Sequence, residues 1–256
     1  MADADRLFGI PELDDSLMPF LPPGWLGVIA GPSGAGTHLL AKQFAAAGVG
    51  AYPVLYYATN ERTQDVQQAF RDFGWDPDAV RILNLDDEYY ERVLLRQLEV
   101  SQTRERGLKA GDLVHAGQVP LPLRPYSLTT RILADLGQLD GPFRMVIDSI
   151  DFLIEVLGPV ELIALVRQIR HRAQTLGGHA VLVLHPQIHD ARTNGLLEEM
   201  SDLVVALEVG SEGERFFTRL AVRKIRNHPE RNRFLNAEVT EGGLKLMASV
   251  PAAGHR

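Results

Sequence analysis

Residues 25–38 read WLGVIAGPSGAGTH, an apolar run followed by a glycine-rich segment. The run Trp25–Ala30 predicts a short buried strand, because it is bounded by Pro22-Pro23-Gly24 before it and a glycine after it. From Thr37 the apolar residues change to helical spacing, and Gly48 predicts the end of that helix. The stretch therefore predicts a strand, a tight turn and a helix in direct succession.

The turn fits the G-x-x-x-x-G frame of a phosphate-binding (Walker A) loop. Its glycines permit a tight backbone, and the helix behind it offers free N–H groups and a positive dipole end to an anion. The Lys and the Ser or Thr that normally bind the outer phosphates and Mg²⁺ are replaced, so ATP with Mg²⁺ is expected to bind about one to two decades more weakly. The candidate loop consists of Gly31, Pro32, Ser33, Gly34, Ala35, Gly36, Thr37 and His38.

Other residues are candidates for the remaining parts of an ATPase site. Asp148 ends the apolar strand Phe143–Ile147 in the manner of a Walker B residue, which would hold Mg²⁺ through water. Glu61 is placed either to polarise an attacking water or to complement a helix dipole. Lys42 lies about 7.5 Å along the helix and is expected to point away from the loop.

Two replaced positions in the loop have interpretations of their own. The hydroxyl of Thr37 is expected to cap the helix, and contact with a phosphate is the alternative. His38 alone does not make a metal site, because no other ligand accompanies it in the sequence, and we expect no structural metal.

The rest of the chain predicts an α/β fold. Apolar strands are expected over 54–58, 80–83, 143–147 and 180–184, and helices over 63–73, 88–106, 127–136 and 160–175. Continuous apolar strands alternating with helices indicate a mostly parallel sheet with helices on both faces. From residue 216 onward short strands without helices predict an antiparallel extension on one edge. We predict a single domain over 1–256, with 107–125 as a surface loop or insertion.

Composition limits the function. The net charge of −7 argues against broad nucleic-acid binding. The chain has no Cys, no secretory signal at its start and no apolar run long enough to span a bilayer, which favours a cytoplasmic protein. Basic residues gather near the end of the chain, from Arg219 to Arg233.

Several short motifs, taken in order, resemble the KaiC-like branch of the RecA-superfamily ATPases. They span roughly residues 7–247 and are interrupted at the predicted loop. The motifs are Gly9–Asp14, the glycine-rich turn, Tyr56–Asp65, Phe70–Asp76, Met145–Ser149, Glu198–Asp202, Arg223–Arg226 and Gly242–Leu244.

The resemblance implies a RecA-type core, commonly assembled as a hexameric ring with nucleotide between subunits. It also implies that Lys224 and Arg226 reach the phosphates bound by a neighbouring subunit; a solvated edge hairpin is the alternative interpretation. The chain departs from the family at the two loop positions, at Asn60, which replaces an acid, and at His185-Pro186, which replaces a polar pair.

These departures gather around one pocket, so our first hypothesis is a catalytically inactive, regulatory or scaffolding relative. It would bind nucleotide weakly or not at all and act by assembling with itself or with a competent relative. A slow ATPase that uses backbone amides and the neighbour's Lys224 and Arg226 is the second hypothesis. A recombinase-paralogue-like DNA accessory protein is the third, although its expected DNA loop, Pro186–Leu196, has only Arg192 as a full positive charge.

Overall fold

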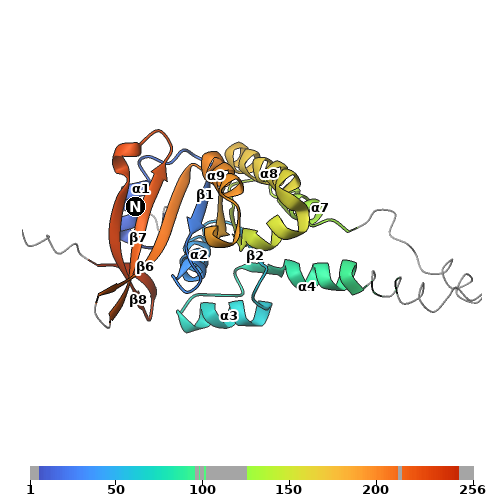
Figure 1. The fold of residues 1–256 in the computed structure, drawn as a ribbon, viewed down its shortest axis with the longest axis horizontal. Helices are drawn as coiled ribbons and strands as arrows, with labels where there is room; N and C mark the ends of the chain where they lie inside the picture. Colours follow the sequence, from blue (N-terminus) through green and yellow to red (C-terminus); the bar gives the residue numbers. More distant parts are fainter. Residues whose placement is uncertain (1–5, 96–97, 99–100, 102–125, 213–214, 248–256) are drawn as a thin grey trace, which may run out of the picture.

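The computed structural model describes residues 6–95, 98, 101, 126–212 and 215–247. Within these ranges one sheet has the strand order β3-β2-β4-β5-β1-β6-β7-β8-β9 (Figure 1). The six strands from β3 to β6 pair in parallel. Their bounds are β1 Trp25–Ala30, β2 Val54–Ala58, β3 Arg81–Asn84, β4 Arg144–Asp148, β5 His179–Leu184 and β6 Leu203–Glu212. The predicted α/β class and mostly parallel sheet are confirmed.

The antiparallel extension is also confirmed. Strands β7 (Arg215–Ile225), β8 (Arg233–Thr240) and β9 (Gly243–Leu246) continue the sheet from β6, each antiparallel to the one before. They form the orange and red side of Figure 1. The predicted loop over 107–125 lies outside the described residues.

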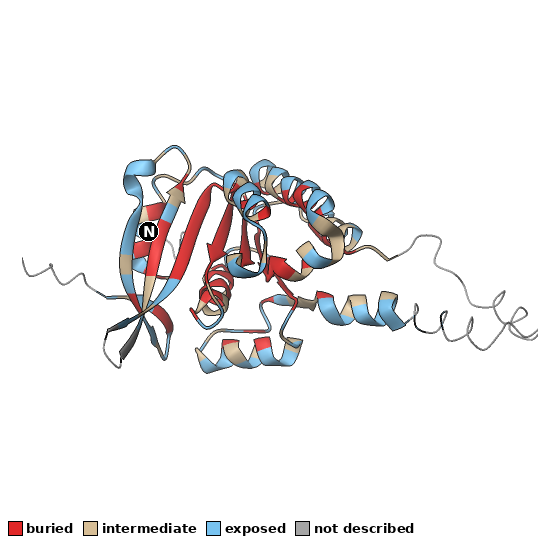
Figure 2. Cartoon of the chain, viewed as in Figure 1, coloured by how far each residue is buried: buried red, intermediate tan, exposed pale blue. Residues whose placement is uncertain are grey.

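Apolar side chains fill two layers, one on each face of the sheet. Along β1, Trp25 and Ile29 belong to one hydrophobic cluster, whereas Leu26 and Val28 belong to the other. Successive side chains of a strand point to opposite faces, so a fully apolar strand supplies both layers. Figure 2 shows the resulting buried strands between helices whose outer surfaces are exposed.

Helices cover both faces, as predicted. The first cluster includes residues of α1, α2 and α3, and the second includes residues of α4, α7, α8 and α9. Their bounds are α1 Pro11–Leu17, α2 Thr37–Ala46, α3 Thr63–Asp72, α4 Leu85–Tyr89, α7 Leu128–Gly137, α8 Ile150–Leu176 and α9 Ala191–Met200.

Three helical segments differ from the sequence prediction. The helix expected over 88–106 begins earlier, as α4, and continues as a π-helix over Tyr90–Leu94, beyond which most residues are outside the described ranges. Helix α8 begins ten residues before the expected Val160 and has a non-helical kink at Gly158, which precedes Pro159. A proline disfavours helical geometry in the residue before it, so the sequence pattern marked only the second half. Much of the expected DNA loop is helix α9.

Candidate functional site

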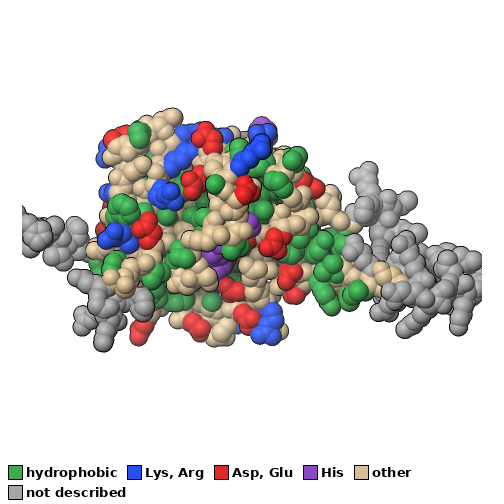
Figure 3. Space-filling model, in the orientation of Figure 1, with side chains coloured by type: hydrophobic (Ala, Val, Ile, Leu, Met, Phe, Trp, Pro, Cys, Tyr) green, Lys and Arg blue, Asp and Glu red, His purple; other side chains and the backbone are tan. Residues whose placement is uncertain are grey.

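The candidate site lies at the carboxyl edge of the parallel strands. The phosphate loop follows β1, Glu61 lies shortly after β2, Asp148 ends β4 and His185 follows β5. Because these strands are parallel neighbours, their ends bring residues distant in sequence to one edge of the sheet. Figure 3 shows histidine and acidic side chains close to the centre of one face of the molecule.

The loop retains the backbone of a phosphate cradle. Gly34 and Gly36 have φ values of +83° and +92°, in the region that favours glycine. Space for a Cβ beside Gly34 is free of other atoms within 4 Å, so the loop is open on that side. Helix α2 begins directly behind it, at Thr37, and the backbone therefore still offers N–H groups to an anion.

Thr37 does not cap the helix. Gly36 is the N-cap residue, and it makes no side-chain capping bond. Thr37 is instead fully buried as the first residue of α2, and its Oγ1 makes no hydrogen bond to the described residues. The predicted capping role of Thr37 was wrong by one position, because Gly36, in the left-handed conformation, already occupies the N-cap position.

Asp148 is engaged by the protein on both carboxylate oxygens. His38 Nδ1 bonds to Oδ1, and the Tyr56 hydroxyl donates to Oδ2. Lys42 Nζ lies 3.9 Å from Oδ2. The side chain is 3% exposed. The carboxylate that was predicted to hold Mg²⁺ is therefore surrounded by two nitrogenous side chains and a hydroxyl.

Lys42 points into the site, contrary to the expectation that it lies away from the loop. Its Nζ donates to Glu61 Oε1 at 2.7 Å, and its side chain is 5% exposed. His38 and Lys42 are four residues apart and so share one helix face, and the long lysine side chain covers the remaining distance. That i, i+4 relation was the sequence signal for this contact. Glu61, the predicted general base, is paired with an ammonium group.

The pKa values reflect these contacts. The bond to Asp148 raises the pKa of the His38 imidazole above its ordinary value. Burial alone would raise the pKa of Asp148, but the bond and charge of His38, the charge of Lys42 and the bond from Tyr56 together hold it below its usual range. Burial and the neighbouring carboxylate raise the pKa of Tyr56, so its hydroxyl stays protonated. The raised pKa of His38 and the lowered pKa of Asp148 both favour the charged forms of this pair.

A second buried carboxylate, Asp151 in the first turn of α8, holds two further histidines. His185 Nδ1 lies 2.5 Å from Asp151 Oδ2, and His189 Nε2 lies 2.8 Å from Oδ1. Burial would raise the pKa of Asp151, but hydrogen bonds from His185 and Ser149 lower it below its usual value. The sequence singled out His185 as a departure, whereas Asp151 and His189 carried no signal, because only the fold brings them together.

His38, from the group around Asp148, and His185, from the group around Asp151, both line a pocket of about 560 Å³ beside the loop. The rings of His38 and His185 are 5.1 Å apart between centres. Ligand atoms of His38, Glu61 and Asp148 also lie within 4.8 Å of one another. The pocket is lined by Pro32, Ser33, His38, Asn60, Asp151, Phe152, Glu155, His185, Gln187 and Ile188.

The residues present do not fit Mg²⁺ with ATP in the usual way. Mg²⁺ needs a carboxylate that accepts its bound water, and Asp148 already accepts bonds from two side chains. The loop offers backbone groups to phosphate but no lysine, and the described pocket lining supplies two carboxylates and neither Lys nor Arg. The anion cradle is retained, whereas the metal-binding part is occupied by side chains.

Lys224 and Arg226, on or beside the end of β7, bind their own chain. Lys224 Nζ donates to the carbonyls of Glu198 and Glu199 at 2.7 and 3.0 Å. Arg226 Nε bonds to Asp202 Oδ1 at 2.5 Å, and its Nη2 donates to carbonyls at the end of α9. Burial and the charge of Arg226 lower the pKa of Lys224. Their predicted contact with a neighbouring subunit stays a prediction.

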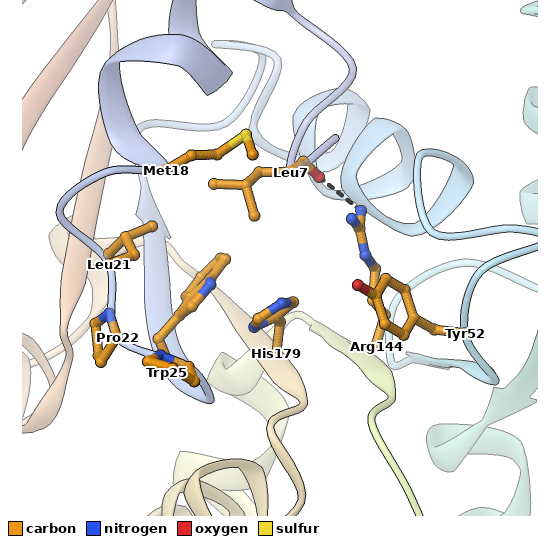
Figure 4. A pocket seen from close by; sticks show the side chains of 9 residues that line it. Leu7, Met18, Leu21, Pro22, Trp25, Tyr52, Arg144 and His179 are labelled. Atoms are coloured by element: carbon orange, nitrogen blue, oxygen red, sulfur yellow. Dashed lines mark hydrogen bonds between the residues drawn. The ribbon is translucent and has the colours of Figure 1, made fainter. Parts of the chain in front are cut away.

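A second pocket, of about 210 Å³, lies at the opposite edge of the sheet, where β1, β4 and β5 begin (Figure 4). Arg144 is buried there and donates to the carbonyls of Leu7 and Phe44 at 2.7 Å each. His179 stacks on Trp25 with ring centres 5.1 Å apart. These contacts fasten the N-terminal segment to the sheet, and they are remote from the phosphate loop.

The strand order, the phosphate loop and the acid that ends β4 define a RecA-type P-loop NTPase fold. Comparison with family models matches residues 8–250 to the KaiC ATPase, and the chain belongs to that family. The KaiC-like protein of the hyperthermophilic archaeon Pyrococcus horikoshii OT3 has a similar structure. Its TM-score is 0.65 at 16% identity, with 94% of this chain and 97% of that chain covered. Comparison with curated protein sequences gives no match.

Among the described residues, no helix is both long and apolar enough to cross a membrane.

Proposed function

We propose that this KaiC-family protein has lost ATP hydrolysis and acts as a regulatory or scaffolding component of the signal-transduction type. The observation that carries the proposal is the protein-bound state of Asp148, whose two carboxylate oxygens accept bonds from His38 and Tyr56. The His38 imidazole and the Lys42 ammonium take the place beside the acids that a metal would need. The acids are thereby neutralised from within the fold.

Loss of the usual contacts weakens each stage of catalysis. Without the loop lysine, the outer phosphates lose a charge-assisted contact, worth about 1.5–3 kcal/mol. The Lys42 ammonium bonded to Glu61 Oε1 stabilises the charged carboxylate and so makes it a weaker base towards water. Developing charge on a transferred phosphoryl group would find two pocket carboxylates, Asp151 and Glu155, in place of a cation. Weak or absent nucleotide binding without turnover follows.

Assembly is the second part of the proposal. We infer that the retained RecA-type sheet serves assembly, either with further copies of this chain or with a competent relative. A slow ATPase assisted by the neighbour's Lys224 and Arg226 has less support. Both side chains would first have to leave the carbonyls at the end of α9. A DNA accessory role is disfavoured by the net charge of −7.

The test combines calorimetry with a turnover assay. The wild-type chain is titrated with ATP and Mg²⁺ and assayed for phosphate release, beside the double variant Thr37→Lys/His38→Thr. We expect no wild-type turnover above background and tighter nucleotide binding by the double variant, which regains both missing contacts. Wild-type hydrolysis well above background that Asp148→Ala abolishes would overturn the proposal. Sedimentation of the chain alone and with nucleotide measures assembly.

A further inference from the structure

Two histidines from different elements face one pocket. His38 lies in the first turn of α2, and His185 lies directly after β5. Both line the 560 Å³ pocket, with ring centres 5.1 Å apart and planes inclined at 40°. The side chain of His38 is 32% exposed and that of His185 is 12% exposed, so His38 is the more accessible of the two.

Each of the two rings is fixed through Nδ1 by its own buried carboxylate. Asp148 bonds to His38, and Asp151 bonds to His185. Both Nε2 atoms lie outside these bonds, and the buried Nε2 of His185 has no hydrogen-bond partner among the described residues. A carboxylate on one imidazole nitrogen fixes the ring orientation and makes the other nitrogen a better metal ligand.

The separation of the rings suits a shared metal ion. Two imidazoles whose nitrogens lie about 2 Å from one tetrahedral ion have ring centres about 5 Å apart. The observed 5.1 Å agrees with this value. The orphaned nitrogen of His185 would then gain the partner that it lacks, which removes the cost of leaving a buried polar atom unsatisfied.

The charge around the pair favours a cation. Among the described residues that line the pocket, Asp151 and Glu155 are acidic, and none is Lys or Arg. Imidazole nitrogen binds Zn²⁺, Co²⁺ and Ni²⁺ well, whereas Mg²⁺ prefers oxygen ligands. The ligand set is thus of a different chemical class from the magnesium site of a working ATPase.

We propose that His38 and His185 bind one divalent transition-metal ion of the Zn²⁺ class at the mouth of the phosphate loop. Each ring binds through an unprotonated Nε2, so any proton on the Nε2 of His38 is released to solvent as the ion binds. Asp148 and Asp151 orient the two rings, and the other coordination positions are filled by water. The site needs no nucleotide, so it stands whether or not the chain hydrolyses ATP.

The experiment is a Co²⁺ titration of the full-length, tag-free, chelator-treated chain without nucleotide, followed by calorimetry and by visible absorption. We expect one ion per chain with the absorption of a tetrahedral site. Replacing either ligand, by His38→Ala or His185→Ala, should weaken binding more than the roughly 10- to 100-fold that loss of an orienting partner costs. Asp151→Asn tests that smaller effect. His171→Ala, at an exposed histidine of α8 that does not line the pocket, is the matched control and should bind as the wild type does.

The thermal midpoint of each metal-free variant establishes that it folds. If the more buried His185 variant does not fold, the partly exposed His38→Ala variant carries the test. Wild-type affinity in a folded His38→Ala or His185→Ala variant would overturn the assignment. So would a loss of binding on His171→Ala, or the absence of saturable Co²⁺ binding by the wild type. None of these measurements depends on ATP. The metal-site proposal is therefore tested independently of the proposed loss of ATP hydrolysis.

Discussion

Replacing Lys42 by methionine should leave Glu61 and Asp148 without their ammonium partner, so that the stability of the protein comes to depend on an added cation. The variant keeps an unbranched apolar side chain of nearly the same length and removes the ammonium group. Glu61 and Asp148, whose oxygens the ammonium approaches to 2.7 and 3.9 Å, then face each other without it. Breaking a buried ion pair costs about 3–5 kcal/mol. Glu61 is 34% exposed, so water screens part of the loss, and we expect about 2 kcal/mol.

The assay is urea unfolding of Lys42→Met, Glu61→Gln and the double variant, with and without Mg²⁺. In the double variant Glu61 no longer carries a charge, so only Asp148 is left without the ammonium. Most of the unfolding free energy lost in Lys42→Met should therefore be recovered. The expected coupling energy between the two substitutions is about 1–2 kcal/mol. Glu61 is then released from the ammonium, and magnesium that binds this carboxylate at ten times its dissociation constant should stabilise Lys42→Met by about 1.4 kcal/mol. It should leave the wild type unchanged, because the ammonium already occupies that place.

A matched control comes from the surface pair of Arg62 and Asp65, whose side chains are 76% and 50% exposed. Arg62→Met should cost less than about 0.5 kcal/mol and gain nothing from magnesium. The reasoning is refuted if Lys42→Met is as stable as this control, or if Mg²⁺ stabilises the wild type and Lys42→Met equally. Either result would mean that Lys42 does not stand in for a metal ion.

Three further predictions concern the scaffold. Burial and the charge of Arg144 lower the pKa of His179 to about 4, so wild-type stability should fall as the pH drops from about 6.5 towards 4, by at most about 3 kcal/mol. His179→Phe, which keeps a ring on Trp25, should reduce that slope in unfolding measured across this range. Arg144→Met should cost about 3 kcal/mol in urea unfolding at neutral pH, because buried carbonyls lose their donor. Asp190→Ala removes the cap of α9 and should lower the thermal midpoint, at a cost of about 1 kcal/mol that Asp190→Asn largely avoids.

The sequence predicted the fold well because its signals are local. Each parallel strand is a short apolar run, and each carries side chains for both hydrophobic layers, as Trp25 and Leu26 do. The kinked first half of α8 escaped prediction, because Gly158 and Pro159 interrupt the pattern and only tertiary packing continues the helix across them. Helix α9 was taken for a loop, although Asp190 caps its start.

The site was predicted only in part, because most of its contacts are between strands that are distant in sequence. The positions of the loop, Asp148 and Glu61 follow from motifs, whereas their partners do not. Tyr56 and Asp148 are 92 residues apart, and Asp151 and His185 are 34 apart. A motif shows which expected residues are absent, but it does not show which other side chains contact Asp148 and Glu61 instead.

The replacement of the usual loop residues and the burial of Lys42 are best understood together. An ATPase that loses its Mg²⁺ would leave Asp148 and Glu61 as two uncompensated carboxylates at one buried edge of the sheet, at a cost of several kcal/mol. Here two side chains on one face of α2 replace the metal ion from within the chain: the Lys42 ammonium bonds to Glu61, and His38 bonds to Asp148. A substitution that merely weakened phosphate binding would not need such compensation. Because these partners come from the fold itself, the two acids are offset without nucleotide or metal, which is what the proposed scaffolding role needs.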